Sequence, residues 1–164
     1  MRVSVFVSLA VCSIVAVSSV QAADFPAEFL GTWKLGESEN FDEYLTAKGY
    51  GWITRQVVKL ASITKTFEKG TSPGIFTAKI DTSKSDVEWI NVPFDKEFEA
   101  DYIDDSKHKI KFYYKDGTLF EDHKPIGDSE SKPELYSYKK DGADKIIMFM
   151  TADGVTAKRW YHKQ

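Results

Sequence analysis

The sequence has little that could stabilise it covalently. It contains one cysteine in 164 residues, Cys12, so no two cysteines of one chain can form a disulfide. It also has no Asn-x-Ser/Thr site for an N-linked glycan. We therefore expect the fold to be held by its apolar core alone, which a chain of this length is able to bury.

The sequence also lacks an excess of basic residues. Its 22 Lys and Arg against 25 Asp and Glu give a formal net charge of −3, and no basic cluster suggests a nucleic-acid partner. Hydrophobic residues make up 42% of the chain and charged residues 29%, which is typical of one globular domain rather than a disordered or fibrous chain. No repeat, low-complexity tract or linker divides it.

The first 22 residues have the features of a secretory signal peptide. Arg2 precedes an apolar run over residues 3–20, and small residues follow at Ala22, where cleavage is expected. A membrane anchor is the alternative, because a run of about 20 apolar residues is long enough to span a bilayer. The cleavage-like site favours removal, so we expect a signal peptide at 1–22 and a secreted domain at 23–164.

One region early in the chain is typical of helices. Apolar residues recur there at helical spacing: Phe41, Tyr44 and Leu45. A side-chain oxygen of Ser38 or Asn40 is placed to cap the start of this helix. Gly49 and Gly51 end it, and a second short helix is expected over residues 52–60, with Ile53, Val57 and Leu60 on one side. Together the two helices form an αα-hairpin.

The rest of the chain alternates apolar and polar residues with the period of β-strands. Turn signals such as Asp116-Gly117 and Asp153-Gly154 separate about ten short strands in total, which indicates an antiparallel barrel or sandwich. Closing the sheet removes its exposed edges. Because a barrel of about eight strands already has room for one small ligand, about ten strands point to an interior cavity.

The last strand carries polar side chains on an apolar face. Alternate residues share this face: Val155, Ala157, Arg159 and Tyr161. If the small apolar residues face inward, Arg159 and Tyr161 point into the barrel. A buried guanidinium is costly unless it is paired, and a ligand carboxylate fits its planar fork while a tyrosine adds a donor. Two alternatives stay open: the strand is turned over, or Arg159 pairs with an interior acid.

A serine-hydrolase pattern occurs at Gly70-Thr71-Ser72-Pro73-Gly74. The G-x-S-x-G nucleophile needs a strand, a sharp turn and then a helix, but an alternating strand follows here. The residue after the serine must also donate its N–H to the oxyanion, and Pro73 has none. We therefore expect a loop between strands at this position and predict no catalytic residue.

The histidines and acids do not form a metal-binding pattern. The hairpin at Asp116-Gly117 is expected to bring His108 and His123 face to face, but no Cys or Asp set with ligand spacing accompanies them. The acids at 101, 104 and 105 lack the alternating spacing of a calcium loop. No glycine-rich phosphate loop is present. We predict no metal site and no cofactor.

The sequence closely resembles the fatty-acid-binding protein family. Matching positions occur without a gap near the start of the domain: Phe29 to Leu35, Ser38, Asn40 to Asp42, Tyr44, Leu45, Gly49 and Thr54 to Gln56. Arg159-Trp160-Tyr161 resembles the family's closing Arg-x-Tyr, and the likeness covers 25–164. Lipocalins share a Gly-x-Trp but place a long helix after the barrel. The leader and the segments 40–45 and 49–53 resemble the secreted members from nematodes.

This resemblance implies a fold and a ligand site. The fold is all-β: a ten-stranded antiparallel up-and-down β-barrel, calycin-like, capped by a short helix-turn-helix lid after the first strand. One long-chain fatty acid, or a retinoid, lies inside with its carboxylate held by Arg159 and Tyr161. The residues expected to line the cavity and portal are Phe41, Tyr44, Leu45, Val57, Phe76 and Tyr138.

One position departs from the family pattern. Many members carry a second Arg or a Gln where this sequence has Ser137 or Tyr138, so the resemblance implies that the second cation is missing. Arg159 would then hold the carboxylate more weakly or through water.

The expected function is extracellular storage and transport of lipid by a monomeric carrier that is not an enzyme. Basic residues on or near the expected helices, Lys48, Arg55 and Lys59, are expected to touch acidic membrane headgroups transiently. The alternative is an extracellular barrel that docks on a membrane or a partner and binds ligand only incidentally.

Overall fold

The computed structural model describes residues 23–128 and 131–164. The expected signal peptide at 1–22 lies outside them. The elements, in chain order, are η1 (Ala27–Phe29), β1 (Gly31–Glu39), α1 (Phe41–Ala47), α2 (Trp52–Lys59), β2 (Ile63–Lys69), β3 (Ile75–Thr82), β4 (Asp86–Pro93), β5 (Glu97–Asp101), β6 (Lys107–Lys115), β7 (Thr118–Pro125), β8 (Glu134–Lys140), β9 (Lys145–Ala152) and β10 (Val155–Lys163).

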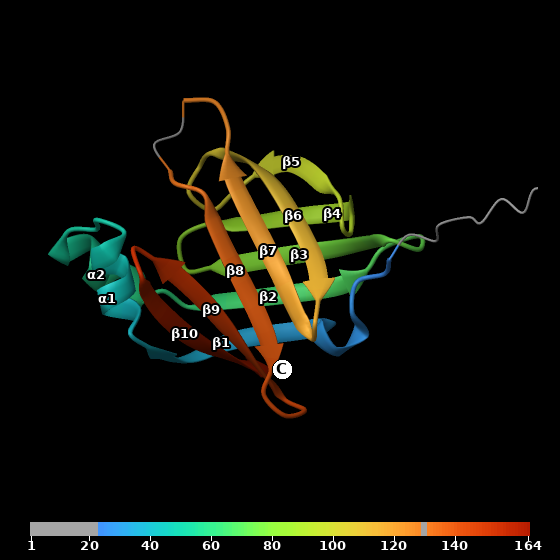
Figure 1. Ribbon diagram of the computed structural model, residues 1–164, viewed down its shortest axis with the longest axis horizontal. Coiled ribbons are helices and arrows are strands. Elements are labelled where there is room, and N and C mark those ends of the chain that lie inside the picture. The colour runs from blue at the N-terminus through green and yellow to red at the C-terminus, as the bar shows by residue number, and fades with distance from the viewer. Residues whose placement is uncertain (1–22, 129–130) are drawn as a thin grey trace, which may run out of the picture.

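The ten strands form one antiparallel sheet that curls into a barrel (Figure 1). Their order is β4-β3-β2-β1-β10-β9-β8-β7-β6-β5, so neighbours in sequence are neighbours in space and β10 returns to β1. No ladder joins β4 to β5 in the described part of the chain. Trp89 on β4 reaches across this opening and donates its indole N–H to the Asp101 carbonyl at 3.1 Å. The predicted fold class, a ten-stranded up-and-down barrel with a lid of two helices, is confirmed.

The two helices follow β1 directly and lie at one end of the barrel, whereas the described chain begins at the other end (Figure 1). The predicted apolar face of α1 is buried: Phe41, Tyr44 and Leu45. The predicted side-chain cap is wrong. Asn40 instead adopts a left-handed conformation with φ of 55° and makes no capping hydrogen bond. Asparagine tolerates that conformation better than most residues. No helix in the described ranges is long and apolar enough to cross a membrane.

Aromatic rings fill the half of the barrel far from the helices. The Phe25 ring, just before η1, lies 4.7 Å from that of Phe76, and Phe76 contacts Phe112 edge-on at 5.1 Å. Phe67 and Phe94 complete this cluster. Offset and edge-on packing of this kind stabilises an apolar core beyond its area alone. The chain entering the domain therefore plugs this end of the barrel with its own side chains.

The G-x-S-x-G pattern lies in the turn between β2 and β3, as predicted. Gly74 there has a φ of 73°, a conformation that glycine adopts at little steric cost, and its N–H is accepted by the Asp24 carboxylate at 2.6 Å. Strand β3, and no helix, follows Ser72. The arrangement required for a hydrolase nucleophile is therefore absent at Ser72.

Candidate functional site

Strand β10 turns Arg159 and Tyr161 into the barrel. Their side chains are buried, with exposed fractions of 4% and 1%. Lys158, the residue before Arg159 on β10, faces outward and pairs with Glu39 at 3.0 Å. The inward orientation follows from the strand period and matches the sequence prediction. The alternative of an overturned strand is wrong.

A bulge in β1 brings a hydroxyl to Arg159. The register of β1 against β10 shifts between Leu35, opposite Tyr161, and Ser38, opposite Arg159. Gly36 permits this close approach, because a Cβ atom there would lie 2.7 Å from the His162 ring. Ser38 Oγ then accepts a hydrogen bond from Arg159 Nε at 3.2 Å.

The Arg159 guanidinium is buried without an acid. Its central carbon lies 4.0 Å from the centroid of the Phe41 ring, a cation–π contact with the first residue of α1. Among the residues the structure describes, no carboxylate lies within ion-pair distance of it, so the alternative of an interior acid partner is wrong for Arg159. Burial lowers the pKa of Arg159, and the opposing effects of Tyr161 and Tyr44 are smaller. A guanidinium has five N–H donors, which leaves most of them open to a ligand anion.

Tyr161 offers a second donor close by. Its hydroxyl donates to Met148 Sδ at 3.7 Å, and a thioether is a weak acceptor. Met148 on β9 stands opposite Arg159 in the ladder, so cation and hydroxyl lie on the same patch of wall. Burial raises the pKa of Tyr161 to about 12, with Arg159 opposing, so the hydroxyl keeps its proton at physiological pH.

A second polar cluster crosses the barrel interior. Lys65 on β2 pairs with Glu121 on β7, Nζ to Oε2 at 3.0 Å, and both side chains are at most 4% exposed. The two strands are five places apart in the sheet order, so the pair joins opposite walls. Tyr138 on β8 hydrogen-bonds to both partners, and His123 Nε2 lies 2.8 Å from Glu121 Oε1. We call Lys65, Glu121, Tyr138 and His123 the interior network.

The interior network keeps Glu121 ionised. Burial by itself would raise the pKa of this carboxyl, but the Lys65 ammonium and the His123 hydrogen bond outweigh burial and lower it to about 2. Burial raises the pKa of Tyr138 well above its ordinary range, and the Glu121 charge adds to that effect, so this hydroxyl remains a donor. The network therefore satisfies its own charges within the barrel.

This cluster changes the prediction about the second cation. Tyr138, and not Ser137, faces inward, and it lies beside Met148 in the row that contains Arg159. That position holds no cation, as the resemblance implied, but Lys65 enters the interior from β2 and is a cation at a different position. In the sequence Lys65 shares a strand face with the apolar Ile63 and Phe67, and this alternation is the signal that it points inward. Its acid partner could not be read from the sequence, because it lies on the far wall.

The structure brings together most of the predicted lining residues. Phe41, Tyr44 and Leu45 on α1 are buried over β10, and Tyr138 lies in the interior network. Phe76 is buried too, but in the aromatic cluster at the far end. Val57 does not lie with them. It sits on the outer side of α2 with 63% of its side chain exposed, because α2 buries none of its residues.

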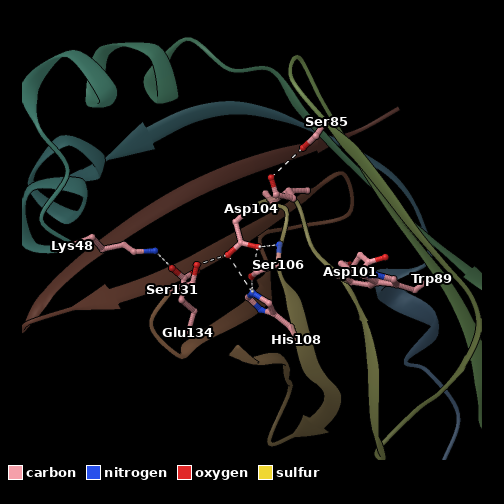
Figure 2. Close-up of polar contacts among 10 residues, drawn as sticks. Lys48, Ser85, Trp89, Asp101, Asp104, Ser106, His108, Ser131 and Glu134 are labelled. Carbon is pink, nitrogen blue, oxygen red and sulfur yellow. Dashed lines mark hydrogen bonds and ion pairs between the residues drawn. The ribbon is translucent and has the colours of Figure 1, made fainter. Parts of the chain in front are cut away.

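A chain of polar contacts ties the lid to the loops around it (Figure 2). Lys48 at the end of α1 forms an ion pair with Glu134 at the start of β8. Just before it in the chain, Ser131 donates to the Asp104 carboxylate at 2.6 Å. Asp104 also contacts His108 Nε2 at 3.2 Å. These links fix the two loops that flank the lid.

The cations expected to meet membrane headgroups are paired within the protein. Lys48 binds Glu134, while Arg55 and Lys59 on α2 both contact Asp42, at 3.4 and 3.1 Å. The described ranges hold no group of His, Cys, Asp and Glu side chains able to bind a metal ion. The rings of His108 and His123 face each other inside the barrel, as expected from the Asp116-Gly117 hairpin, with their centroids 5.4 Å apart.

Known proteins share this architecture and much of this sequence. No family model matches the chain. The chain is 45% identical to "Fatty acid-binding protein homolog 2" of Caenorhabditis elegans over 144 residues, 88% of this chain and 89% of that protein. It resembles the solved structure of As-p18, an extracellular fatty acid binding protein, with a TM-score of 0.81 and 42% identity over 86% of this chain and 99% of that one. A Schistosoma mansoni fatty acid binding protein in complex with arachidonic acid gives a TM-score of 0.67 and 25% identity over 84% and 97%.

Proposed function

We propose a ligand and a role for this chain, which belongs to the fatty-acid-binding protein family: it carries one long-chain fatty acid inside its barrel. One observation supports the proposal above all. Arg159 is a buried cation with no acidic partner among the described residues, and Tyr161 presents a hydroxyl beside it. A buried charge without a counterion is unfavourable, and a ligand carboxylate supplies the missing charge.

The carboxylate accepts hydrogen bonds from the Arg159 guanidinium and the Tyr161 hydroxyl. Charge-assisted bonds of this kind are stronger than neutral ones and fix the orientation of the head group. The acyl chain adds about 0.8 kcal/mol for each CH₂ removed from water. The far half of the barrel is occupied by its aromatic cluster and Arg159 itself lies against α1, so the acyl chain stays in the half of the barrel beneath the helices. A retinoid with an acidic head group would offer Arg159 the same anion.

The role we assign is extracellular storage and transport of lipid by a monomer. Residues 1–22 have the pattern of a signal peptide, and the similar As-p18 is extracellular. The ligand lies in a buried, non-catalytic setting: the two polar groups that meet it are a guanidinium and a tyrosine of high pKa. We therefore propose a carrier and not an enzyme.

A second candidate role rests on α2. This helix carries large apolar side chains that face solvent: Trp52, Ile53, Val57 and Leu60. Exposed apolar side chains next to one another often mark a surface that contacts a membrane or a protein. Contact of α2 with a membrane is compatible with lipid delivery. If the interior took no lipid, such docking would be the main role and ligand binding incidental.

Displacement of a fluorescent fatty acid tests the proposal with two variants from one strand. Arg159→Ala removes the inward cation, and Lys158→Ala removes its outward neighbour. We expect Arg159→Ala to weaken binding at least tenfold, the effect of about 1.4 kcal/mol, and Lys158→Ala to change it less than twofold. Equal losses in the two variants would contradict the assignment of Arg159 to the carboxylate.

A further inference from the structure

Two buried nitrogen atoms remain without partners at the end of the barrel beneath the helices. They are the Nδ1 atoms of His108 on β6 and His123 on β7, whose side chains are 2% and 0% exposed. An unsatisfied buried polar atom is unfavourable and is rare in folded proteins. The function proposed above assigns no role to either atom, and their strands β7 and β6 lie three and four places from β10 in the sheet order.

The other nitrogen of each ring fixes what these atoms are able to do. His123 Nε2 lies 2.8 Å from the ionised Glu121 carboxylate. His108 Nε2 lies 3.2 Å from the Asp104 carboxylate and 2.9 Å from Ser106 Oγ, which donates its own hydrogen to Asp104 and so accepts from the ring. A carboxylate only accepts hydrogen bonds, so each Nε2 carries the hydrogen. In the neutral imidazole the opposite nitrogen then has a lone pair and no hydrogen. In that neutral form both orphan Nδ1 atoms are acceptors that need a donor.

The surroundings offer little except aromatic rings. The His123 ring lies 4.3 Å from that of Tyr102, 5.6 Å from Tyr136 and 6.0 Å from Trp89, centroid to centroid. The His108 ring lies 4.8 Å from Tyr102. An apolar box with two acceptor atoms selects a small donor on an otherwise apolar molecule. A carboxylate has no hydrogen to donate to a neutral imidazole, so it does not match these acceptors.

The apolar box formed by His108, His123, Tyr102, Tyr136 and Trp89 lies at a distance from Arg159 along the barrel wall. In the ladder, Arg159 stands opposite Met148, Met148 opposite Tyr138, and Tyr138 opposite Leu119 on β7. His123 is four residues beyond Leu119 toward the β7–β8 loop, about 13 Å of strand rise. A lipid with its carboxylate on Arg159 therefore passes across the barrel toward the box with its chain, not its head group.

We propose that His108 and His123 form a second polar subsite, which binds a hydroxyl on the chain of the lipid. This inference rests on the proposed function and names the ligand class more closely: a fatty acid hydroxylated away from its carboxylate. The hydroxyl donates to an imidazole Nδ1, and the remaining chain packs on the aromatic walls. The rival occupant is an ordered water molecule, which would satisfy the same acceptors without any preference among ligands.

The test compares binding of hexadecanoate with its mid-chain and terminal hydroxy derivatives. For the wild type we expect one hydroxyl position to bind roughly three- to tenfold more tightly than the parent acid, the range of one neutral hydrogen bond. In His108→Phe, which leaves the interior network intact, this advantage disappears, while the affinity for the parent acid changes less than twofold. His123→Phe gives a second readout of the advantage, with urea unfolding to check that the protein keeps its fold without the hydrogen bond from His123 to Glu121.

The outcomes separate this inference from the proposed function. If the wild type binds the parent acid but binds no hydroxy acid more tightly than the parent acid, the nitrogen atoms hold only water and the subsite is refuted. If the advantage survives in both phenylalanine variants, the hydroxyl lies elsewhere and the assignment to these residues is wrong. If neither acid binds to the wild type, the proposed function itself fails.

Discussion

The Arg159 guanidinium on β10 lies 4.0 Å from the centroid of the Phe41 ring at the first turn of α1. The buried cation assigned to the ligand is thus in contact with the lid. Ser38, three residues before Phe41, accepts a hydrogen bond from the same guanidinium. Arg159 therefore contacts the segment leading into α1 through Ser38 and the first residue of α1 through Phe41. Occupation of Arg159 and the position of the lid are therefore linked.

This link predicts an effect on ligand exchange. Phe41→Leu keeps an apolar side chain under the lid but removes a cation–π contact of about 1–2 kcal/mol. We expect fatty-acid association and dissociation both to become several times faster, with a smaller change in Kd. Stopped-flow displacement measures the rates, and Glu43→Ala on the exposed side of α1 is the control. Unchanged rates for Phe41→Leu would show that the contact does not hold the lid.

Arg159 is expected to lower the stability of the ligand-free protein while it serves binding. Arg159→Met keeps most of the side-chain stem but removes the unpaired buried charge. We expect the free energy of unfolding without ligand to stay the same or rise by up to about 2 kcal/mol, while fatty-acid affinity falls at least tenfold. Urea unfolding of delipidated protein measures the first quantity. A loss of more than about 2 kcal/mol would mean that Arg159 has a structural role.

The interior network predicts a different response for Glu121. Glu121→Gln leaves the Lys65 ammonium buried without its counterion, which costs on the order of 3 kcal/mol. Asp122→Asn, on the same strand but paired at the surface with Lys124, should cost less than about 1 kcal/mol. Chemical denaturation of the two variants provides the comparison. Similar losses in both would contradict the assignment of a buried charge pair to Glu121.

The low pKa of Glu121 makes this stabilisation depend on pH. The carboxyl titrates near 4.5 when unfolded and near 2 when folded, so the native state binds fewer protons between these values. The stabilisation is therefore complete above about pH 4.5 and is lost as the pH falls toward 2. We expect the gap in unfolding free energy between wild type and Glu121→Gln to narrow over this window. A gap that stays constant between pH 5 and 2 would argue against an ionised Glu121.

The exposed face of α2 predicts a contact-dependent step in lipid transfer. Ile53→Ser with Leu60→Ser should slow transfer to phospholipid vesicles several-fold and weaken its dependence on vesicle concentration. Ile90→Ser on β4, an equally exposed apolar position outside the lid, is the matched control. Since Arg55 and Lys59 are paired with Asp42, we expect only a weak effect of anionic lipid. If the α2 variant transferred lipid to vesicles at the same rate as the wild type, the proposed contact of α2 with membranes would be contradicted.

The sequence predicted the parts of this structure that depend on local periodicity. Strand alternation gave the barrel and the inward direction of Arg159 and Tyr161, and helical spacing gave the buried face of α1. The interior network was missed because Lys65 and Glu121 lie 56 residues apart on opposite walls, and alternation says nothing about what a side chain meets across a cavity. Similarly, the outward position of Val57 depends on how α2 docks.

Two local features near the start of α1 also differ from what the sequence predicts: the helix cap and the bulge in β1. The sequence predicts that the side chain of Ser38 or Asn40 caps α1, but Asn40 adopts a left-handed backbone conformation and no side chain makes the capping hydrogen bond. The bulge that sets Ser38 against Arg159 inserts one extra residue into β1 between Leu35 and Ser38, and the apolar–polar pattern of the sequence does not mark it.

Native mass spectrometry of residues 23–164, purified without removal of lipid, tests the central claim most directly. We predict one bound molecule with the mass of a long-chain fatty acid per chain, and loss of that mass in Arg159→Ala but not in Lys158→Ala. A bare protein that also fails to take up added oleate would contradict the claim that this barrel carries a fatty acid.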